Sequence, residues 1–369
     1  MDDMLSGSNS LEELEKLYIE VKKLLALGKF DLHKWRSNAT NFLYNLDTTT
    51  TNEPLPIEVD SSAKALGVLW NSLSDKFQFL YKTEFSTKIT KRVVLSELAQ
   101  LFDPLGLINP VVVLGKIFMQ ELWILKENWD ESLPQYLSDQ WQRFREELHC
   151  INQIEFSRSL IESAKIINIE LHGFCDSSQR AYGCVVYAKV FYINGSISIN
   201  LIGAKSRIAP LKSNSLPRLE LRGAVLLVEF INKLINSMPL TFDDLYMWTD
   251  STIVLHWLAS HSSRWSTFVA NRVALIQELS MNAKWNKIDT KLNPADIISR
   301  GMYPSQLQNC SLWRNGPDFL RLPFNEWPAQ KLVVEFEVSP EMEERTTMIS
   351  LISHAFVDVV ITSKYVNTF

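Results

Sequence analysis

The order of strands and helices between residues 166 and 299 constrains the fold of this chain more than any other feature. Hydrophobic periodicity predicts five strands, at residues 166–175, 181–191, 196–204, 244–249 and 284–288. It predicts four helices, at residues 216–237, 251–259, 266–280 and 294–299. Asn194-Gly195, between the second and third strands, is a strong hairpin signal. This order predicts an α/β (α+β) fold, a mixed five-stranded sheet with helices on its faces.

The chain has 369 residues, which is enough for two to three domains. Residues 11–27 have helical spacing, with Ser10 or Asn9 as N-cap and Gly28 as the stop. The pattern then predicts a short strand at 30–35 and a hairpin formed by 66–70 and 77–81. A helical module follows and is interrupted by turn residues at 103–106 and 109–110. We expect four parts, with boundaries at residues 1–85, 86–155, 160–305 and 306–369.

Four acidic residues stand where predicted strands give way to loops and helices. They are Asp176 after the first strand, Glu220 early in the long helix, Asp250 after the fourth strand and Asp296 in the last helix. Each also has an ordinary structural explanation. Asp176 suits a turn, Asp250 an N-cap and Asp296 the first turn of a helix. Glu220 is placed to form an ion pair with Arg218 or Arg222.

Taken together, these four acids indicate a metal-dependent site. Strand ends and helix starts of such a sheet converge at one edge, where ligands bind. Carboxylates in one cleft repel each other unless cations lie between them, and Mg²⁺ prefers oxygen ligands. Two such ions about 4 Å apart can activate a water and stabilise the leaving oxygen when a phosphodiester is cleaved.

The charge of the chain is weakly acidic as a whole and basic around this site. A formal charge of −5 excludes nucleic-acid binding by bulk positive charge. Residues 170–304 hold 14 Lys/Arg and 10 Asp/Glu, a local charge of +4. Lys205, Arg207, Lys212 and Arg218 cluster around the start of the long helix and form a candidate phosphate track. The candidate substrate contacts, which are weaker than the four acids, are Ser177, Lys205, Arg207 and Arg218. A solvated basic loop is the simpler explanation for the same residues.

Other classes of protein are disfavoured by motifs that this sequence lacks. Its four cysteines form no Cys-x-x-Cys, so neither a zinc ribbon nor a secreted disulfide framework is expected. The most apolar stretch, 111–119, is too short to span a membrane, and the N-terminus is not a signal peptide. We therefore expect an intracellular protein, cytoplasmic or nuclear, with no membrane partner.

Several stretches resemble the ribonuclease H region of BEL/Pao-type LTR retrotransposons (the Pao retrotransposon peptidase family region). They are GFCDSSQRAYGCVVY, AKSRIAPLKSNSLPRLEL, MWTDSTIVLHWL and KLNPADIISRG, with FDPLGL upstream. The resemblance implies a ribonuclease H-like fold and cleavage of the RNA strand of RNA/DNA hybrids. It implies two Mg²⁺ ions, with Mn²⁺ as an alternative, held by Asp176, Glu220, Asp250 and Asp296. An aspartic peptidase is not expected, because no Asp-Thr/Ser-Gly triplet occurs.

One departure from that family lies in the loop before Asp296. Many ribonucleases H have a histidine there that assists product release, and this loop, 289–294, has none. Asp289 and Lys291 are two alternatives for that role. His256 and His261 lie elsewhere and are expected on the surface of the helix after Asp250.

The N-terminal residues resemble the end of a reverse-transcriptase Tyr-x-Asp-Asp box, in which Asp2 and Asp3 would be a remnant polymerase metal site. The third aspartate and the fingers of such a polymerase are not in this chain. We therefore expect an incomplete reverse-transcriptase palm, a thumb/connection module, a ribonuclease H-like domain and a linker toward an integrase. Polymerase activity is not expected. The alternative to an active ribonuclease H is an inert or domesticated fragment that only binds nucleic acid or a partner.

Overall fold

The structure is a computed structural model of the chain. It describes residues 6–8, 10–30, 32, 35–39, 42, 62–65, 68–81, 85–126, 128–161, 165–212, 214–328 and 343–344. The chain divides into two compact units. The first comprises Met1–Ile167, Val190–Ala204 and Gly301–Gly316. The second comprises Asn168–Lys189, Lys205–Arg300 and Pro317–Phe369.

A small antiparallel sheet belongs to the first unit. Its strands, in spatial order, are β1 (Ser62–Ala65), β2 (Val68–Asn71), β3 (Lys76–Gln78) and β4 (Glu155–Ser157). Trp70 lies opposite Phe77, so the predicted hairpin is confirmed. The indole of Trp70 donates a 3.0 Å hydrogen bond to Asp75 in the turn.

The predicted N-terminal helix is also confirmed, as α1 (Leu11–Leu27). Ser10 is its N-cap, because the Ser10 hydroxyl accepts the backbone N–H of Glu13. The strand predicted at 30–35 is not found in the described residues of that stretch, Phe30, Leu32 and Trp35.

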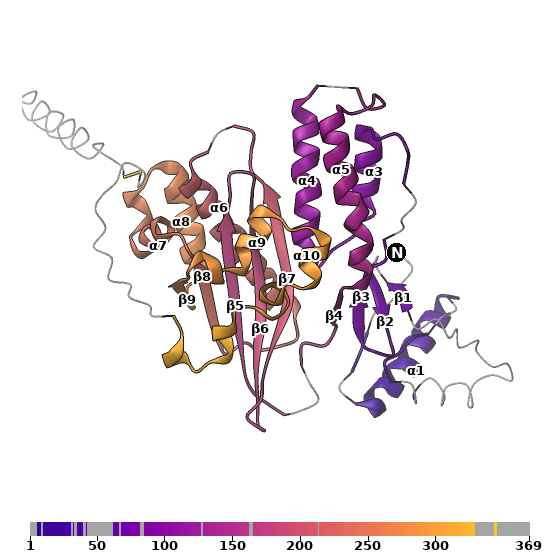
Figure 1. Ribbon diagram of the computed structural model, residues 1–369. Helices are drawn as coiled ribbons and strands as arrows, with labels where there is room; N and C mark the ends of the chain where they lie inside the picture. The colour runs from indigo at the N-terminus through magenta and orange to yellow at the C-terminus, as the bar shows by residue number, and fades with distance from the viewer. Residues whose placement is uncertain are drawn as a thin grey trace, which may run out of the picture. The chain divides into compact units, whose positions relative to one another are not determined.

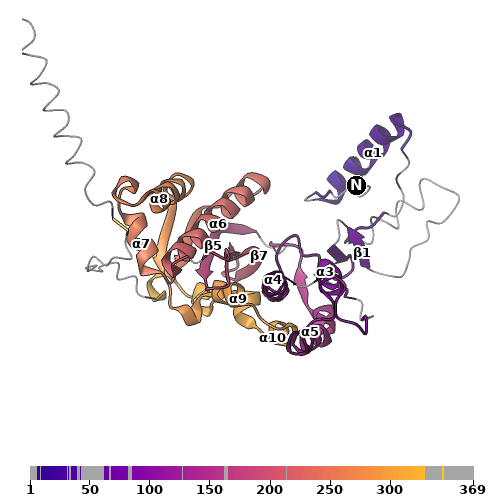
Figure 2. The ribbon, with the colours of Figure 1, turned by 90° about the horizontal axis from the view of Figure 1, so that it is seen from above.

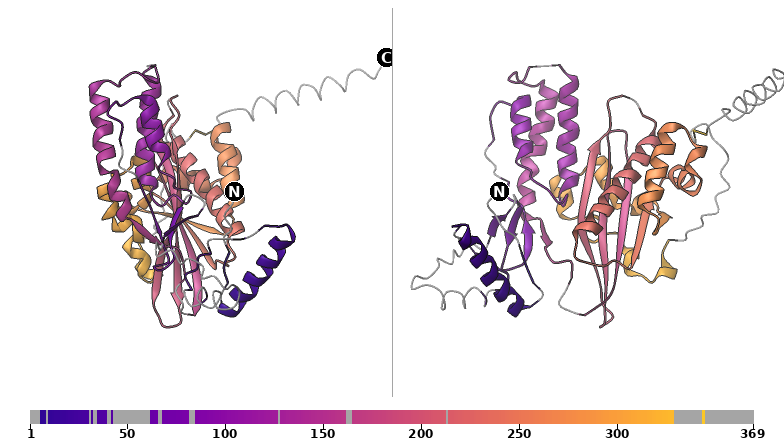
Figure 3. Two further views of the ribbon diagram at one scale, coloured as in Figure 1. Left: turned by 90° about the vertical axis from the view of Figure 1, so that its right-hand side faces the viewer. Right: turned by 180° about the vertical axis from the view of Figure 1, so that it is seen from behind.

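Three helices form the rest of this unit's core, namely α3 (Lys91–Ala99), α4 (Asn109–Ile124) and α5 (Gln135–Glu147). They run side by side (Figure 3). The predicted interruption before α4 has a clear cause. The Asp103 carboxylate accepts the backbone N–H groups of Leu107 and Ile108, at 2.8 and 2.9 Å, and so ends one segment and starts the next. Burial raises the pKa of Asp103 to about 6.

The second sheet has five strands, as predicted. They are β5 (Ile166–Ser177), β6 (Ala181–Tyr192), β7 (Ile197–Ile208), β8 (Asp244–Thr249) and β9 (Ala283–Lys287). The spatial order is β7-β6-β5-β8-β9 (Figure 1). Strand β8 lies parallel to both β5 and β9. Gly195 has φ +82° in the turn between β6 and β7, which confirms the hairpin predicted from Asn194-Gly195. The α/β fold class with a mixed five-stranded sheet is therefore confirmed.

Helices cover both faces of this sheet (Figure 2). They are α6 (Leu216–Ser237), α7 (Thr252–Ala259), α8 (Thr267–Leu279) and α9 (Pro294–Arg300). Gly173 of β5 faces Leu227 and Ile231 of α6, whereas Gly183 of β6 faces Ile298 of α9. None of the helices in the described ranges is long and apolar enough to cross a membrane.

Residues 304–327 differ from the linker that the sequence predicts from residue 306. They form α10 (Pro304–Gln308), α11 (Ser311–Asn315) and two 3₁₀ turns, Asp318–Arg321 and Phe324–Glu326. Trp313 is buried and donates to the Leu107 carbonyl. Trp327 packs on Trp248, with ring centroids 5.7 Å apart. Burial of these large aromatic side chains favours packing of residues 304–316 on the first unit and of residues 317–327 on the second. The remaining domain boundaries stay predictions.

Candidate active site

The pairing of β5 with β8 brings two of the predicted acids to the same sheet edge. Cys175 lies opposite Thr249 in the parallel register, so Asp176 and Asp250 follow at adjacent strand ends. Asp296 comes from α9, and its charge and that of Asp250 both act on Asp176. Glu220 comes from α6. Three aspartates from three separate elements are thus close enough to interact.

The electrostatics of Asp176 reflect this crowding. Burial is the largest cause that raises the pKa of Asp176, to about 7, and the negative charge of Asp250 adds to it. A hydrogen bond from Ser299 lowers the pKa of Asp176. A carboxyl group that resists ionisation beside other carboxylates is what a cation-binding site without a cation should contain.

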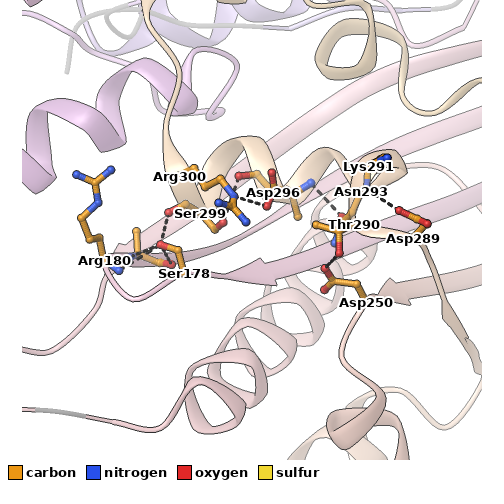
Figure 4. A network of polar contacts seen from close by, with 12 residues as sticks. Ser178, Arg180, Asp250, Asp289, Thr290, Lys291, Asn293, Asp296, Ser299 and Arg300 are labelled. Carbon is orange, nitrogen blue, oxygen red and sulfur yellow. Dashed lines mark hydrogen bonds and ion pairs between the residues drawn. The ribbon is translucent and has the colours of Figure 1, made fainter.

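One carboxylate oxygen of Asp250 accepts a hydrogen bond, and the other has no hydrogen-bond partner. Its Oδ2 accepts a 2.7 Å hydrogen bond from the Thr290 hydroxyl, in the loop before α9 (Figure 4). Its Oδ1 is buried and has no hydrogen-bond partner. Because a buried carboxylate oxygen without a partner is costly, this atom is a candidate ligand for a cation.

The Asn-Pro-Ala-Asp motif positions Asp296. The Asn293 side chain donates to the carbonyl of Cys175 at 3.1 Å and accepts the N–H of Ala295. It therefore caps the start of α9 and ties that helix to the end of β5, next to Asp176. Gly183 allows the close approach on the other side, because a Cβ there would lie 2.2 Å from the Ile298 side chain.

Arg300 supplies positive charge at the same place. Its Nε donates to Asp296 Oδ1 at 2.6 Å, one helical turn away (Figure 4). The hydrogen bond to Asp296 raises the pKa of Arg300, and the charges of Asp176 and Asp250 add to the effect. Arg300 thus partly neutralises the three aspartates.

Glu220 is oriented by a residue that the sequence analysis does not single out. Its Oε2 accepts a 2.5 Å hydrogen bond from the Ser251 hydroxyl, which also caps α7. Ser177 connects the same helix to the sheet, since its hydroxyl donates to the Leu219 carbonyl at 2.8 Å. That bond gives Ser177 a structural role, and its contact with substrate stays a prediction.

The carboxylate oxygens of the four acids are the kind of ligand that a hard divalent cation prefers, although they are not gathered around one point. Among the described residues, no three His, Cys, Asp or Glu side chains are close enough together to hold one ion. Three of the carboxylates have separate hydrogen-bond donors: Thr290 donates to Asp250, Ser251 to Glu220 and Arg300 to Asp296. Mg²⁺ commonly takes one or two carboxylates and keeps several waters, so the open arrangement and the unpartnered Asp250 oxygen fit it.

The predicted phosphate contacts Lys205, Arg207 and Arg218 have different surroundings. Lys205 lies with its Nζ 4.7 Å from the centre of the Phe230 ring, and Arg207 is exposed. Arg218 forms an ion pair with Glu343. Asp2 and Asp3, the predicted polymerase remnant, lie outside the described residues.

The two histidines of the predicted helix region have local contacts. His256 packs edge-on against Trp265, and burial lowers the pKa of its ring. His261 is exposed and contacts Ser263. In the loop without a histidine, Asp289 accepts the N–H of Lys291, so Thr290 is the loop residue that reaches an acid.

Thr290, Ser251 and Arg300 are the site residues that sequence reasoning missed. Ser251 had a signal, because a serine before an apolar helix is a good N-cap. Arg300 had one too, since it stands four residues after Asp296 on a predicted helix. Thr290 had none, because its contact with Asp250 joins residues 40 positions apart.

The family comparison agrees with this geometry. Residues 90–251 match the Pao retrotransposon-like RNaseH-like domain. The match includes Asp176, Glu220 and Asp250, together with the helical module that begins near α3. This part of the chain is therefore similar to a ribonuclease H-like domain of retrotransposon origin. The curated proteins contain no significant match.

Solved structures with some likeness to this chain include ribonucleases H. The N-terminal RNase H domain of Rv2228c from Mycobacterium tuberculosis is 13% identical, with a TM-score of 0.26, and the match covers 36% of this chain and 94% of that one. RNase H1 from Halobacterium salinarum is 14% identical (TM-score 0.22; 35% and 91% covered). A foamy viral protease-reverse transcriptase bound to RNA/DNA hybrid is 10% identical (TM-score 0.37; 62% and 29% covered). These similarities are weak, and the fold rests on the sheet order.

Proposed function

We propose that this chain cleaves the RNA strand of RNA/DNA hybrids with the help of divalent metal ions. The observation that carries the proposal is that Asp176 and Asp250 follow adjacent ends of parallel strands and that Asp250 Oδ1 is buried without a hydrogen-bond partner. Burial and the charges of Asp250 and Asp296 raise the pKa of Asp176 to about 7, which supports the same interpretation. Crowded carboxylates at the end of parallel strands are costly to a fold unless they serve chemistry. The family match over residues 90–251 supports the same class of activity.

In this proposal each acid has a defined place. Asp250, with one oxygen held by Thr290 and the other unpartnered, would bind a cation directly. Asp176 and Asp296 would complete the oxygen donor set around the cations, and Glu220, oriented by Ser251, would contribute a further carboxylate ligand. Bound Mg²⁺ or Mn²⁺ would polarise the phosphodiester and lower the pKa of an attacking water.

The protein's own residues would position the hybrid. Lys205 and Arg207, on the strand edge before α6, and Arg218, two residues before Glu220, are the proposed phosphate contacts. Such contacts fix the register of the duplex and carry no sequence information. We expect recognition by the shape of the hybrid and by the RNA 2′-hydroxyl.

The experiment is a cleavage assay with the full chain and Mg²⁺. Wild-type protein and Asp250→Asn are given a labelled RNA/DNA hybrid and a DNA duplex. We expect the hybrid alone to be cut, and Asp250→Asn to lose at least ~100-fold in rate, because the substitution removes a charged metal ligand.

Asp318→Asn is the matched control, since Asp318 is exposed and outside the site. It should cleave like the wild type. If folded wild-type protein binds the hybrid and leaves it intact with EDTA and with Mg²⁺ alike, the nuclease proposal fails. The chain then binds nucleic acid without cleaving it.

A further inference from the structure

Three arginines of the second unit surround one aromatic ring. The guanidinium carbons of Arg218, Arg222 and Arg272 lie 4.7, 5.4 and 3.7 Å from the centre of the Phe268 ring. Arg218 and Arg222 are one turn apart on α6, and Arg272 is on the neighbouring α8. We call these three residues the arginine patch.

The patch has more positive charge than its described surroundings balance. The Nε of Arg222 is buried without a hydrogen-bond partner. Burial, followed by the charge of Arg222, lowers the pKa of Arg272. The Glu343 carboxylate forms an ion pair with Arg218 of the patch. A partly buried excess of guanidinium groups favours the binding of anions.

Glu343 occupies the patch in the manner of a bidentate anion. Its two carboxylate oxygens accept from Nε and Nη2 of Arg218, at 2.5 and 2.8 Å. The Ser266 hydroxyl donates to the same carboxylate at 2.6 Å, and the Ser266 N–H donates to the Glu343 carbonyl at 2.8 Å. Two parallel bonds from one guanidinium are also how arginine binds a phosphate.

Glu344 extends this attachment. It forms a backbone bridge with Trp265, and its carboxylate pairs with Arg264. The two residues therefore lie beside Trp265 and Ser266, just before the start of α8. Arg218 is two residues from Glu220, so the segment contacts the same end of α6 that carries a proposed metal ligand.

We propose that the acidic segment Glu343–Glu344 competes with the phosphodiester backbone of the RNA/DNA hybrid for the arginine patch, and so restrains hybrid binding within the chain. The inference rests on the function proposed above. It makes the patch a nucleic-acid contact that the bound segment masks, with Arg222 and Arg272 as contacts beyond Arg218.

The test measures hybrid binding by fluorescence anisotropy. All proteins are full chains in the Asp250→Asn background, so that Mg²⁺ can be present without cleavage. The variant Glu343→Gln with Glu344→Gln is compared with Glu12→Gln and Glu15→Gln, two exposed residues of α1. Both variants change the net charge equally. We expect about three- to tenfold tighter binding for the first, because removal of an internal competitor raises the competent fraction, and little change for the second.

A double-mutant cycle identifies the patch as the place of competition. In an Arg218→Gln background, the gain from neutralising Glu343 and Glu344 should disappear, because the segment has lost its main partner. A gain that persists there, or one that the Glu12/Glu15 control shares, overturns the proposal and leaves a general charge effect.

The amide of Ser266 provides a readout that is independent of net charge. Because it donates to the Glu343 carbonyl, its hydrogen exchange should become faster when hybrid displaces the segment. If no variant binds hybrid, the proposed function fails with this inference. If hybrid binds, and neither the affinities nor the Ser266 exchange differ, this inference alone fails.

Discussion

At the scale of single residues, Asp176 makes the stability of the ion-free chain depend on pH. Its pKa is 3.8 in the unfolded reference and about 7 in the folded chain. Below pH 3.8 Asp176 is protonated in both the folded and the unfolded state, so it does not destabilise the folded chain. Above about pH 7 the folded chain must hold Asp176 in its charged form, which lowers its stability. We therefore expect the free energy of unfolding in EDTA to fall, on the order of 4 kcal/mol, between these pH values.

The comparison of Asp176→Asn with the wild type isolates this contribution. Urea unfolding at several pH values in EDTA should show a shallower decline for the variant, whereas Asp318→Asn should decline like the wild type. If Asp176→Asn and the wild type have parallel pH profiles, Asp176 is not destabilised by its neighbours.

Thr290 is a positioning residue that is expected to act through Asp250. Replacement of Thr290 by Val removes the hydroxyl that donates to Asp250 Oδ2 and keeps the shape of the side chain. We expect cleavage at limiting Mg²⁺ to fall about tenfold, since partners of metal ligands have effects of this size. The rate measured against Mg²⁺ concentration should recover with Thr290→Ser, and equal curves for Val and wild type would refute the role.

At the scale of elements, the placement of α9 depends on a glycine. A Cβ at Gly183 would lie 2.2 Å from Ile298 Cγ2 and 2.9 Å from the Lys205 carbonyl oxygen. We expect Gly183→Ala to destabilise the chain by about 1–3 kcal/mol, because a well-packed interface resists an added methyl group. Gly7→Ala should be neutral in the same denaturation measurement, since no atom lies within 4 Å of that Cβ.

A second substitution tests whether the clash is the cause. Ile298→Ala removes the atom nearest to the new methyl group, although it also leaves a cavity. The double variant should therefore lose less stability than the two single variants added together. Strict additivity would place the strain elsewhere, at the Lys205 backbone.

At the scale of the whole molecule, the predictable part is the part with strong periodicity. The strands of residues 166–299 are β-rich runs bounded by turn residues, and the four helices have helical spacing, so local sequence specifies both. The positions of Asp176 and Asp250 follow as well, because parallel strands end together. The strand predicted at 30–35 and the linker predicted from 306 rested on short stretches with weak patterns.

The parts of the site that could not be predicted depend on contacts between distant residues. Arg218 and Glu343 form an ion pair although they are 125 positions apart, and Thr290 donates a hydrogen bond to Asp250, which is 40 positions away in the sequence. Contacts of this kind produce no periodic pattern in a single sequence, so they cannot be predicted from it. The placement of Trp327 also depends on such a contact, because its ring packs on Trp248, 79 positions earlier in the chain.

The most direct test of the account is strand selectivity. A hybrid with different labels on its RNA and DNA strands is incubated with the full wild-type chain and Mg²⁺, and both strands are followed on one gel. We predict cuts in the RNA strand and an intact DNA strand. Intact RNA in the presence of bound, folded protein, or cuts in both strands, would contradict it.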